Sequence, residues 1–215
     1  MINGFSGYKE TEVKEFGPTE KVEVGGHICK VVGVEISPYT SKKDGTVYNQ
    51  LNVRFDLEAP DKQAGFYGKK FAEDAKKDAL TAKWKGCYRL TIPEANSADF
   101  IKSNWKAFLT SIEKSNPGVV IDGEKGFEEA ILVGKLFGGI FGLEEFTLPD
   151  GKTITFSRLR FARSIEKIEE APIPKVKLVD NTYVDYEEYM NGDVKKENDT
   201  SNDEFGTIDD DSLPF

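Results

Sequence analysis

Val47-Tyr-Asn-Gln-Leu-Asn-Val-Arg-Phe-Asp-Leu57 is the stretch of sequence that decides the fold class. Apolar side chains alternate here with polar ones: Val47, Leu51, Val53, Phe55 and Leu57 against Tyr48, Gln50, Asn52, Arg54 and Asp56. A period of two residues predicts a β-strand with one buried face, as in an antiparallel sheet. The other face of this strand would carry an aromatic ring, two amides and an arginine.

Further strands are predicted on both sides of this stretch, at residues 21–36, 84–92, 127–148 and 153–163. After the third strand, Asn96 and Ser97 offer an N-cap, and an apolar stripe from Phe100 to Ile112 predicts a helix. A short helix is also expected around residues 74–82. The order strand, strand, strand, helix, strand, strand is that of the OB-fold. We therefore predict a mainly β protein: a five-stranded antiparallel barrel with its helix between strands 3 and 4.

Charge is divided unevenly along the chain. Residues 178–215 hold 12 Asp and Glu against two Lys, a net charge of −10, which leaves 26 acids and 27 bases, or +1, for residues 1–177. We predict a flexible arm at residues 1–19, an OB-fold-like domain at 20–170, and a linker and acidic tail at 171–215. The tail is expected to be disordered beyond Asp180, because it has too little apolar surface to bury. Tyr183, Tyr186 and Tyr189 would dock on the body only transiently.

Cations and aromatic rings lie together on several predicted strands. Sequence-tolerant binding of a single strand needs cations for phosphates and aromatic faces for bases. The candidate DNA-binding residues are Tyr48, Arg54, Lys69, Lys70, Trp84, Tyr88, Arg89, Lys135, Phe137, Arg158 and Arg160. The alternation of the third strand points Trp84 and Tyr88 away from Arg89. An ordinary core or surface role is the simpler interpretation of each candidate except Tyr48, Arg54, Arg158 and Arg160.

Residues that could carry catalysis are sparse. His27 is the single histidine, and no acid and nucleophile accompany it, so we predict a structural or surface role. The cysteines and histidine have no zinc spacing. Asp122-Gly-Glu124-Lys125 is similar to the carboxylate set of a metal nuclease, but a solvated turn is the better interpretation. We expect no enzyme activity, no metal and no cofactor, with a metal-dependent nuclease kept as a minor alternative.

The chain ends in Asp209-Asp-Asp-Ser-Leu-Pro-Phe215, an acidic run followed by an apolar tip. Such a tip can enter a small hydrophobic pocket of a partner protein while its carboxylates meet a basic rim. The predicted partner-binding residues are Asp209, Asp210, Asp211, Leu213, Pro214 and Phe215. A solubilising acidic tail is the alternative, and it does not account for the terminal Leu-Pro-Phe.

This ending closely resembles the C-terminal tip of bacterial single-stranded DNA-binding proteins, with Leu213 in place of the usual isoleucine. The body resembles single-stranded DNA-binding-like proteins of phages and prophages of low-GC Gram-positive bacteria. The similar stretches are Val24-Gly-Gly-His-Ile-Cys-Lys-Val-Val32, Trp84-Lys-Gly-Cys-Tyr-Arg-Leu90, Leu132-Val-Gly-Lys-Leu-Phe137 and Arg160-Phe-Ala-Arg-Ser164. The resemblance implies an OB-fold, a role in phage DNA replication or recombination, and replication, repair or recombination enzymes as partners of the tip. The resemblance does not identify which residues of this chain contact DNA.

Together these features predict a sequence-tolerant single-stranded DNA-binding protein that recruits partner enzymes. The alternative is a phage adaptor protein that binds a host replication or repair enzyme and has little DNA binding of its own. No apolar run could span a bilayer and no signal-peptide pattern is present. We therefore expect a cytoplasmic protein without membrane contact, in the bacterial host if the chain is phage-encoded. The oligomeric state stays open, with a homo-oligomer as one alternative.

Overall fold

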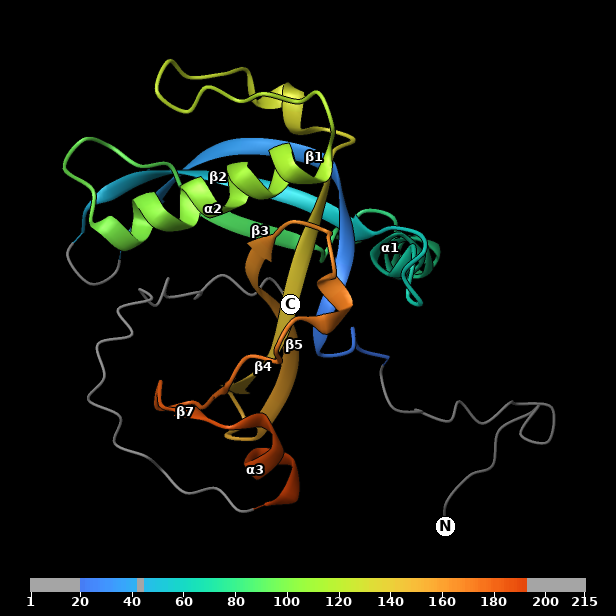
Figure 1. The fold of residues 1–215 in the computed structure, drawn as a ribbon. Helices are drawn as coiled ribbons and strands as arrows, with labels where there is room; N and C mark the ends of the chain where they lie inside the picture. Colours follow the sequence, from blue (N-terminus) through green and yellow to red (C-terminus); the bar gives the residue numbers. More distant parts are fainter. Residues whose placement is uncertain (1–19, 42–44, 193–215) are drawn as a thin grey trace, which may run out of the picture.

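The computed structural model describes residues 20–41 and 45–192, and these residues form a mainly β structure (Figure 1). The sheet has seven strands: β1 (Gly25–Thr40), β2 (Val47–Leu57), β3 (Cys87–Thr91), β4 (Leu136–Thr147), β5 (Thr153–Arg163), β6 (Val176–Lys177) and β7 (Tyr183–Val184). The α-helices are α1 (Phe66–Lys77), α2 (Asp99–Ser115) and α3 (Tyr186–Asn191), and the 3-10 helices are η1 (Glu129–Leu132) and η2 (Ile168–Glu170). The prediction of a mainly β protein is confirmed.

The strands pair in the order β3-β2-β1-β4-β6-β7, and β5 pairs with β4. All the pairs are antiparallel except β4 with β6, where Glu144 lies opposite Lys177. Among the described residues no ladder joins β3 to β5, so the sheet is not closed into a barrel. Helix α2 contacts β3, β4 and β5, and it therefore packs across the gap between the unjoined strands.

The predicted strands at residues 47–57 and 153–163 are confirmed as β2 and β5. Two others are shorter than expected. β3 begins only at Cys87, so Trp84 precedes the strand. β4 begins at Leu136, because the chain before it forms η1 and a loop instead of continuing an extended strand from residue 127.

A β-bulge in β1 explains why the even-numbered apolar residues of this strand do not all face the core. The pairing with β2 skips a residue between Val31 and Gly33. A bulge leaves one residue unpaired and reverses which side chains face inward. Before it, Cys29 and Val31 are buried, whereas Val32 at the bulge is 43% exposed. Beyond it, the inward side chain is that of Val34.

Both long helices begin at other residues than predicted. Helix α1 covers residues 66–77 rather than 74–82, because Asp56 of β2 caps it from outside. The Asp56 carboxylate accepts hydrogen bonds from the amides of Tyr67 at 2.8 Å and Gly68 at 3.0 Å. Helix α2 begins at Asp99 with Ala98 as its N-cap. The Ser97 hydroxyl, which we expected to cap this helix, accepts from the amide of Glu94 at 2.8 Å instead.

The main core lies between the sheet and α2. Helix α2 contributes Phe108, Leu109 and Ile112, all buried, which confirms the core role of its apolar stripe. Phe55 and Phe108 each contact Phe137 edge to face, with ring centroids 5.8 and 5.6 Å apart. Edge-to-face pairs add to the stabilisation that burial of the rings provides.

His27 has a structural role, one of the two predicted for it. The side chains of His27 and Asp61 are only 7% and 8% exposed, and Nδ1 of the ring lies 2.9 Å from the Asp61 carboxylate. Nε2 lies 2.9 Å from the carbonyl oxygen of Glu23. Asp61 also accepts from the amides of Ile28 at 3.3 Å and Gln63 at 2.8 Å. This network ties the turn after β2 to the start of β1.

The segment after residue 175 packs on the sheet, so the expectation of disorder beyond Asp180 is wrong for residues 181–191. Val176, Leu178 and Val184 are buried and form a small cluster with Leu143 of β4, Tyr186 and Tyr189. Acidic composition alone misjudged this segment, because a few of its apolar residues pack together against Leu143 of β4. The predicted arm at residues 1–19 and the tip from Asp209 to Phe215 lie outside the described residues.

We expect His27→Ala to lower the free energy of unfolding by about 3–5 kcal/mol, since it leaves the buried Asp61 carboxylate without its partner. Urea denaturation followed by fluorescence measures this. The control is Lys30→Ala, which breaks an exposed pair with Glu58 (3.4 Å) and should cost less than about 1 kcal/mol. Equal losses in the two variants would contradict a structural role of the buried pair.

Candidate nucleic-acid interface

The exposed side of the β1–β2–β3 sheet carries the polar residues of the alternating pattern. On β2, Tyr48, Asn52 and Arg54 point away from the core that Leu51 and Val53 enter, since neighbouring residues of a strand face opposite sides. The register then places cross-strand partners on the same side: Tyr39 opposite Tyr48, Ser37 opposite Gln50, Glu35 and Arg89 opposite Asn52, and Gly33 and Cys87 opposite Arg54. We call this surface the outer face; it comprises Glu35, Ser37, Tyr39, Tyr48, Asn52, Arg54 and Arg89.

Tyrosines stand at one end of the outer face and arginines at the other. Tyr48 is half-buried beside Tyr39, while Arg54 is exposed. The Arg54 guanidinium pairs with the Glu35 carboxylate at 3.2 Å. Asn52 donates to the Ser37 hydroxyl at 2.8 Å, and Gln50 is buried. The face therefore offers two ring systems, two arginines and one competing carboxylate.

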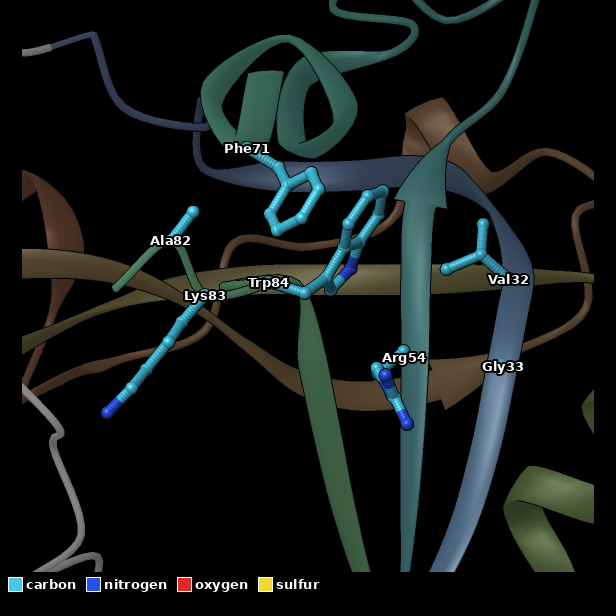
Figure 2. A pocket seen from close by; sticks show the side chains of 7 residues that line it. All are labelled: Val32, Gly33, Arg54, Phe71, Ala82, Lys83 and Trp84. Atoms are coloured by element: carbon cyan, nitrogen blue, oxygen red, sulfur yellow. The ribbon is translucent and has the colours of Figure 1, made fainter. Parts of the chain in front are cut away.

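A groove continues the outer face beyond Arg54. It has a volume of about 520 Å³ and is lined by Val32, Gly33, Arg54, Phe71, Ala82, Lys83 and Trp84 (Figure 2). Helix α1 supplies Phe71, and the loop before β3 supplies Ala82, Lys83 and Trp84. We call this feature the Trp84 groove. The sequence did not predict this groove, because Phe71 contacts Trp84 only when α1 packs on β2.

Trp84 is held in the groove by backbone contacts. Its Nε1 donates to the carbonyl oxygens of Phe55 at 3.0 Å and Gly86 at 3.1 Å. Its ring centroid lies 5.7 Å from that of Phe71, with an angle of 47° between the two planes. Because the strand begins after Trp84, the predicted alternation does not reach it, and the indole lies on the same surface as Arg54 (Figure 2).

Two aromatic candidates belong to the core and are corrected. Phe137 has no exposed surface, so it cannot stack on a base. Tyr88 packs against Phe108 with ring centroids 6.0 Å apart, and burial raises the pKa of its hydroxyl to about 12. Both residues lie in predicted strands, but on the buried side.

Arg158 and Arg160, two further candidate DNA-binding residues, lie in an ion cluster. Three cations surround the Glu144 carboxylate of β4: Lys177 at 2.9 Å, Arg158 at 3.6 Å and Arg160 at 3.8 Å. Arg160 also donates to the Tyr183 hydroxyl at 3.3 Å and lies over its ring. The two arginine side chains are 28% and 17% exposed. Residues 176–184 thus cover the face that carries them.

The candidate lysines lie away from the centre of the outer face. Lys69 and Lys70 are on α1, where Lys69 donates to the carbonyl oxygen of Ala64 at 3.1 Å. Lys70 lies 3.6 Å from both Glu20 and Glu73. Lys135 precedes β4, and its carbonyl oxygen accepts from the amide of Val31 at 2.9 Å. The structure therefore brings together Tyr48, Arg54, Trp84 and Arg89 and leaves the three lysines outside this surface.

The site also contains residues that the sequence did not single out. Tyr39 joins it only through its register with Tyr48. Phe71 and Lys83 join it through the fold of α1 and the following loop. Glu35 joins it because its carboxylate forms an ion pair with Arg54. Glu35 and Tyr39 alternate with apolar residues of β1, which could have placed them on one side of the strand. The bulge changes which side that is, so the sequence did not show them as part of the site.

Acidic groups elsewhere do not assemble into a metal centre. Within residues 20–41 and 45–192, His, Cys, Asp and Glu side chains form no group of three or more that could hold a metal ion. Asp122 instead closes a turn by accepting from the amides of Glu124 and Lys125, both at 3.1 Å, and these hydrogen bonds lower its pKa. Over the same part of the chain, none of the helices combines the length and apolar character needed to cross a membrane.

No family model matches this chain, and the comparison with curated proteins finds no match. The function must therefore be argued from the geometry of the outer face and the Trp84 groove.

We expect Glu144→Gln to loosen residues 176–191, because it leaves three partly buried cations without their common partner. A loss of about 1.4 kcal/mol corresponds to a tenfold larger open population. Amide hydrogen exchange of β6, β7 and α3 measures this. Glu124→Gln, the same change in the exposed turn at Asp122, is the control. If exchange in these elements is unchanged by Glu144→Gln, then the ion cluster does not hold the segment.

Proposed function

We propose that the protein binds single-stranded DNA without strict sequence preference along the outer face. The observation that carries the proposal is the pairing of aromatic and cationic side chains on one exposed surface, with Tyr39 and Tyr48 at one end and Arg54, Arg89 and Trp84 at the other. Rings stack on bases of any identity, and arginines meet phosphates, so such a surface tolerates sequence variation.

The strand connections support an OB-type fold for this function. β1 pairs with both β2 and β4, β2 with β3, and β4 with β5, and α2 lies between β3 and β4 in the chain. These are the neighbours expected in a five-stranded OB barrel that stays partly open, whose second and third strands bind oligonucleotides. The outer face is centred on β2, with Arg89 of β3 on one side and three residues of β1 on the other.

The charge distribution is compatible with this role despite the net charge of −9. The negative charge is concentrated beyond residue 177, and residues 1–177 carry +1.

We further propose that the tip from Asp209 to Phe215 recruits a replication, repair or recombination enzyme in a phage context. That part of the proposal depends on the acidic and apolar sequence of the tip alone.

We expect residues 1–192 to bind fluorescent oligo-dT in preference to duplex DNA of the same length. A truncation after Gly192 keeps the packed segment 176–191, whereas a cut after Lys177 would remove β7 and α3. If Arg54, Lys83 and Arg89 neutralise three phosphates, the affinity should fall about 20-fold between 50 and 200 mM salt. Anisotropy titration measures both properties. Binding to neither DNA would refute the proposal and favour the adaptor alternative.

We expect Glu35→Gln to tighten oligo-dT binding about three- to fivefold. The change frees the Arg54 guanidinium and removes a carboxylate that repels phosphate on the outer face. Asp150→Asn in the β4–β5 turn is the matched control, since it removes the same charge at a distant position while its side-chain oxygen can still accept from Lys152. Equal gains in both variants would mean that only the net charge matters, and not the position of Glu35.

A further inference from the structure

The Trp84 groove differs from the rest of the outer face because it is hollowed and has an aromatic wall. Figure 2 shows the Trp84 ring between Phe71 and Arg54, with Val32 and Gly33 across β2. The remainder of the outer face belongs to three paired strands. A recess with rings on one side and a guanidinium on the other is suited to one discrete ligand rather than to an extended chain.

The Trp84 indole is positioned before any ligand arrives. Its N–H is shared by the carbonyl oxygens of Phe55 and Gly86. The far edge of the ring lies against Gly68 of α1, where an added Cβ would be 3.8 Å from Cη2. A ring held at both ends loses little conformational freedom on binding, which lowers the cost of stacking a base on it.

The space beside Arg54 is kept open by glycine. Gly33 lies opposite Arg54 in the β1–β2 ladder, and a Cβ added there would be 3.9 Å from Arg54 Nε. A larger side chain would therefore reach over the guanidinium. The volume of about 520 Å³ falls within the range of roughly 300–1,000 Å³ typical of small-ligand sites, which is room for one nucleotide.

The Arg54 guanidinium of the groove complements a phosphate. Arg54 Nη2 contacts Glu35 at 3.2 Å, and its side chain is 48% exposed. A guanidinium has five N–H donors in a planar fork, so it can bind a phosphate oxygen beside the carboxylate. Lys83 is exposed at the rim of the same groove, and its side chain extends away from Trp84 and Arg54 (Figure 2). The apolar wall, the fixed ring and the Arg54 guanidinium together match a base joined to a phosphate.

We infer that the Trp84 groove is a single-nucleotide pocket, in which the base of one nucleotide of the bound strand stacks on Trp84 while its phosphate meets Arg54. The inference rests on the proposed function in taking the strand as the source of the nucleotide. The pocket is nevertheless complete without the remaining outer face, so a free deoxynucleoside monophosphate should be sufficient to fill it.

The two tryptophans of the chain allow a direct test. Trp105 stacks on Phe127 with ring centroids 6.2 Å apart, so Trp105→Phe conserves an aromatic ring and leaves Trp84 as the sole indole reporter. With excitation at 295 nm, dAMP should quench this fluorescence saturably. Arg54→Gln should weaken dAMP about fivefold, the loss expected for one charge-assisted contact, and leave the response to deoxyadenosine unchanged. Trp84→Phe, with Trp105 retained, should show no saturable response.

Two further measurements distinguish the proposed binding of a DNA strand from the proposed nucleotide pocket. Tyr48→Ala combined with Arg89→Ala should weaken oligo-dT binding and leave the dAMP response intact. Saturating oligo-dT should abolish the dAMP response, because the strand fills the same pocket. Oligo-dT binding without dAMP quenching would overturn the pocket and leave the proposed function standing. A dAMP response in a protein that fails to bind oligo-dT, or one that persists under saturating oligo-dT, would overturn the strand as its source.

Discussion

β1 belongs to both halves of the sheet, and the rest of the structure depends on that sharing. It pairs with β4 over Gly25–Lys30 and with β2 over Cys29–Thr40, so it changes partners near Cys29. The bulge between Val31 and Gly33 lies just after this change. It lets the first part of the strand bury Cys29 and Val31 in the core, while the second part turns Glu35 and Tyr39 to the outer face.

Hydrogen bonds from neighbouring segments lock this arrangement. His27 and Asp61 connect the start of β1 to the turn after β2, and Asp56 fixes where α1 begins on β2. The position of α1 in turn sets the wall of the Trp84 groove. Three acidic or basic side chains that look like ordinary surface residues in the sequence are thus responsible for the shape of the candidate site.

Local patterns in the sequence were sufficient where a single element determines its own environment. The alternation of β2 gave its bounds and its buried side, and the apolar stripe of α2 gave the side of the helix that meets the core, because burial on one side of each element follows from its own residues. Long-range features could not be obtained in this way. The bulge at Val32 depends on the register with β2, and the start of α1 depends on a carboxylate ten residues earlier in the chain than Phe66. β3 begins only at Cys87, so Trp84 lies outside the strand that the alternation of residues 84–92 predicted.

The residues of the candidate site also differ in whether local sequence patterns could predict them. Tyr48 and Arg54 could be predicted from β2 alone, and Arg89 from β3. Phe137 and Tyr88 could not be excluded, since an aromatic residue in a strand fits either the core or a stacking surface. Arg158 and Arg160 were misjudged because the residues that cover them, Lys177 and Tyr183, come from a segment whose acidic composition predicted disorder. Charge content describes how a segment is solvated on average, whereas a few well-spaced apolar residues decide whether it packs.

The position of α3 has a consequence for how many molecules the protein can hold at once. The helix ends at Asn191 beside the β4–β5 turn, at the opposite end of the molecule from the β1–β2 hairpin (Figure 1). The described part of the chain therefore ends away from the hairpin end of the outer face. If the tip recruits an enzyme as proposed, the enzyme and a strand on the outer face would be held through different parts of the molecule, in a ternary assembly. In such an assembly the protein would act as a tether that raises the local concentration of the enzyme near the DNA without contacting its active site.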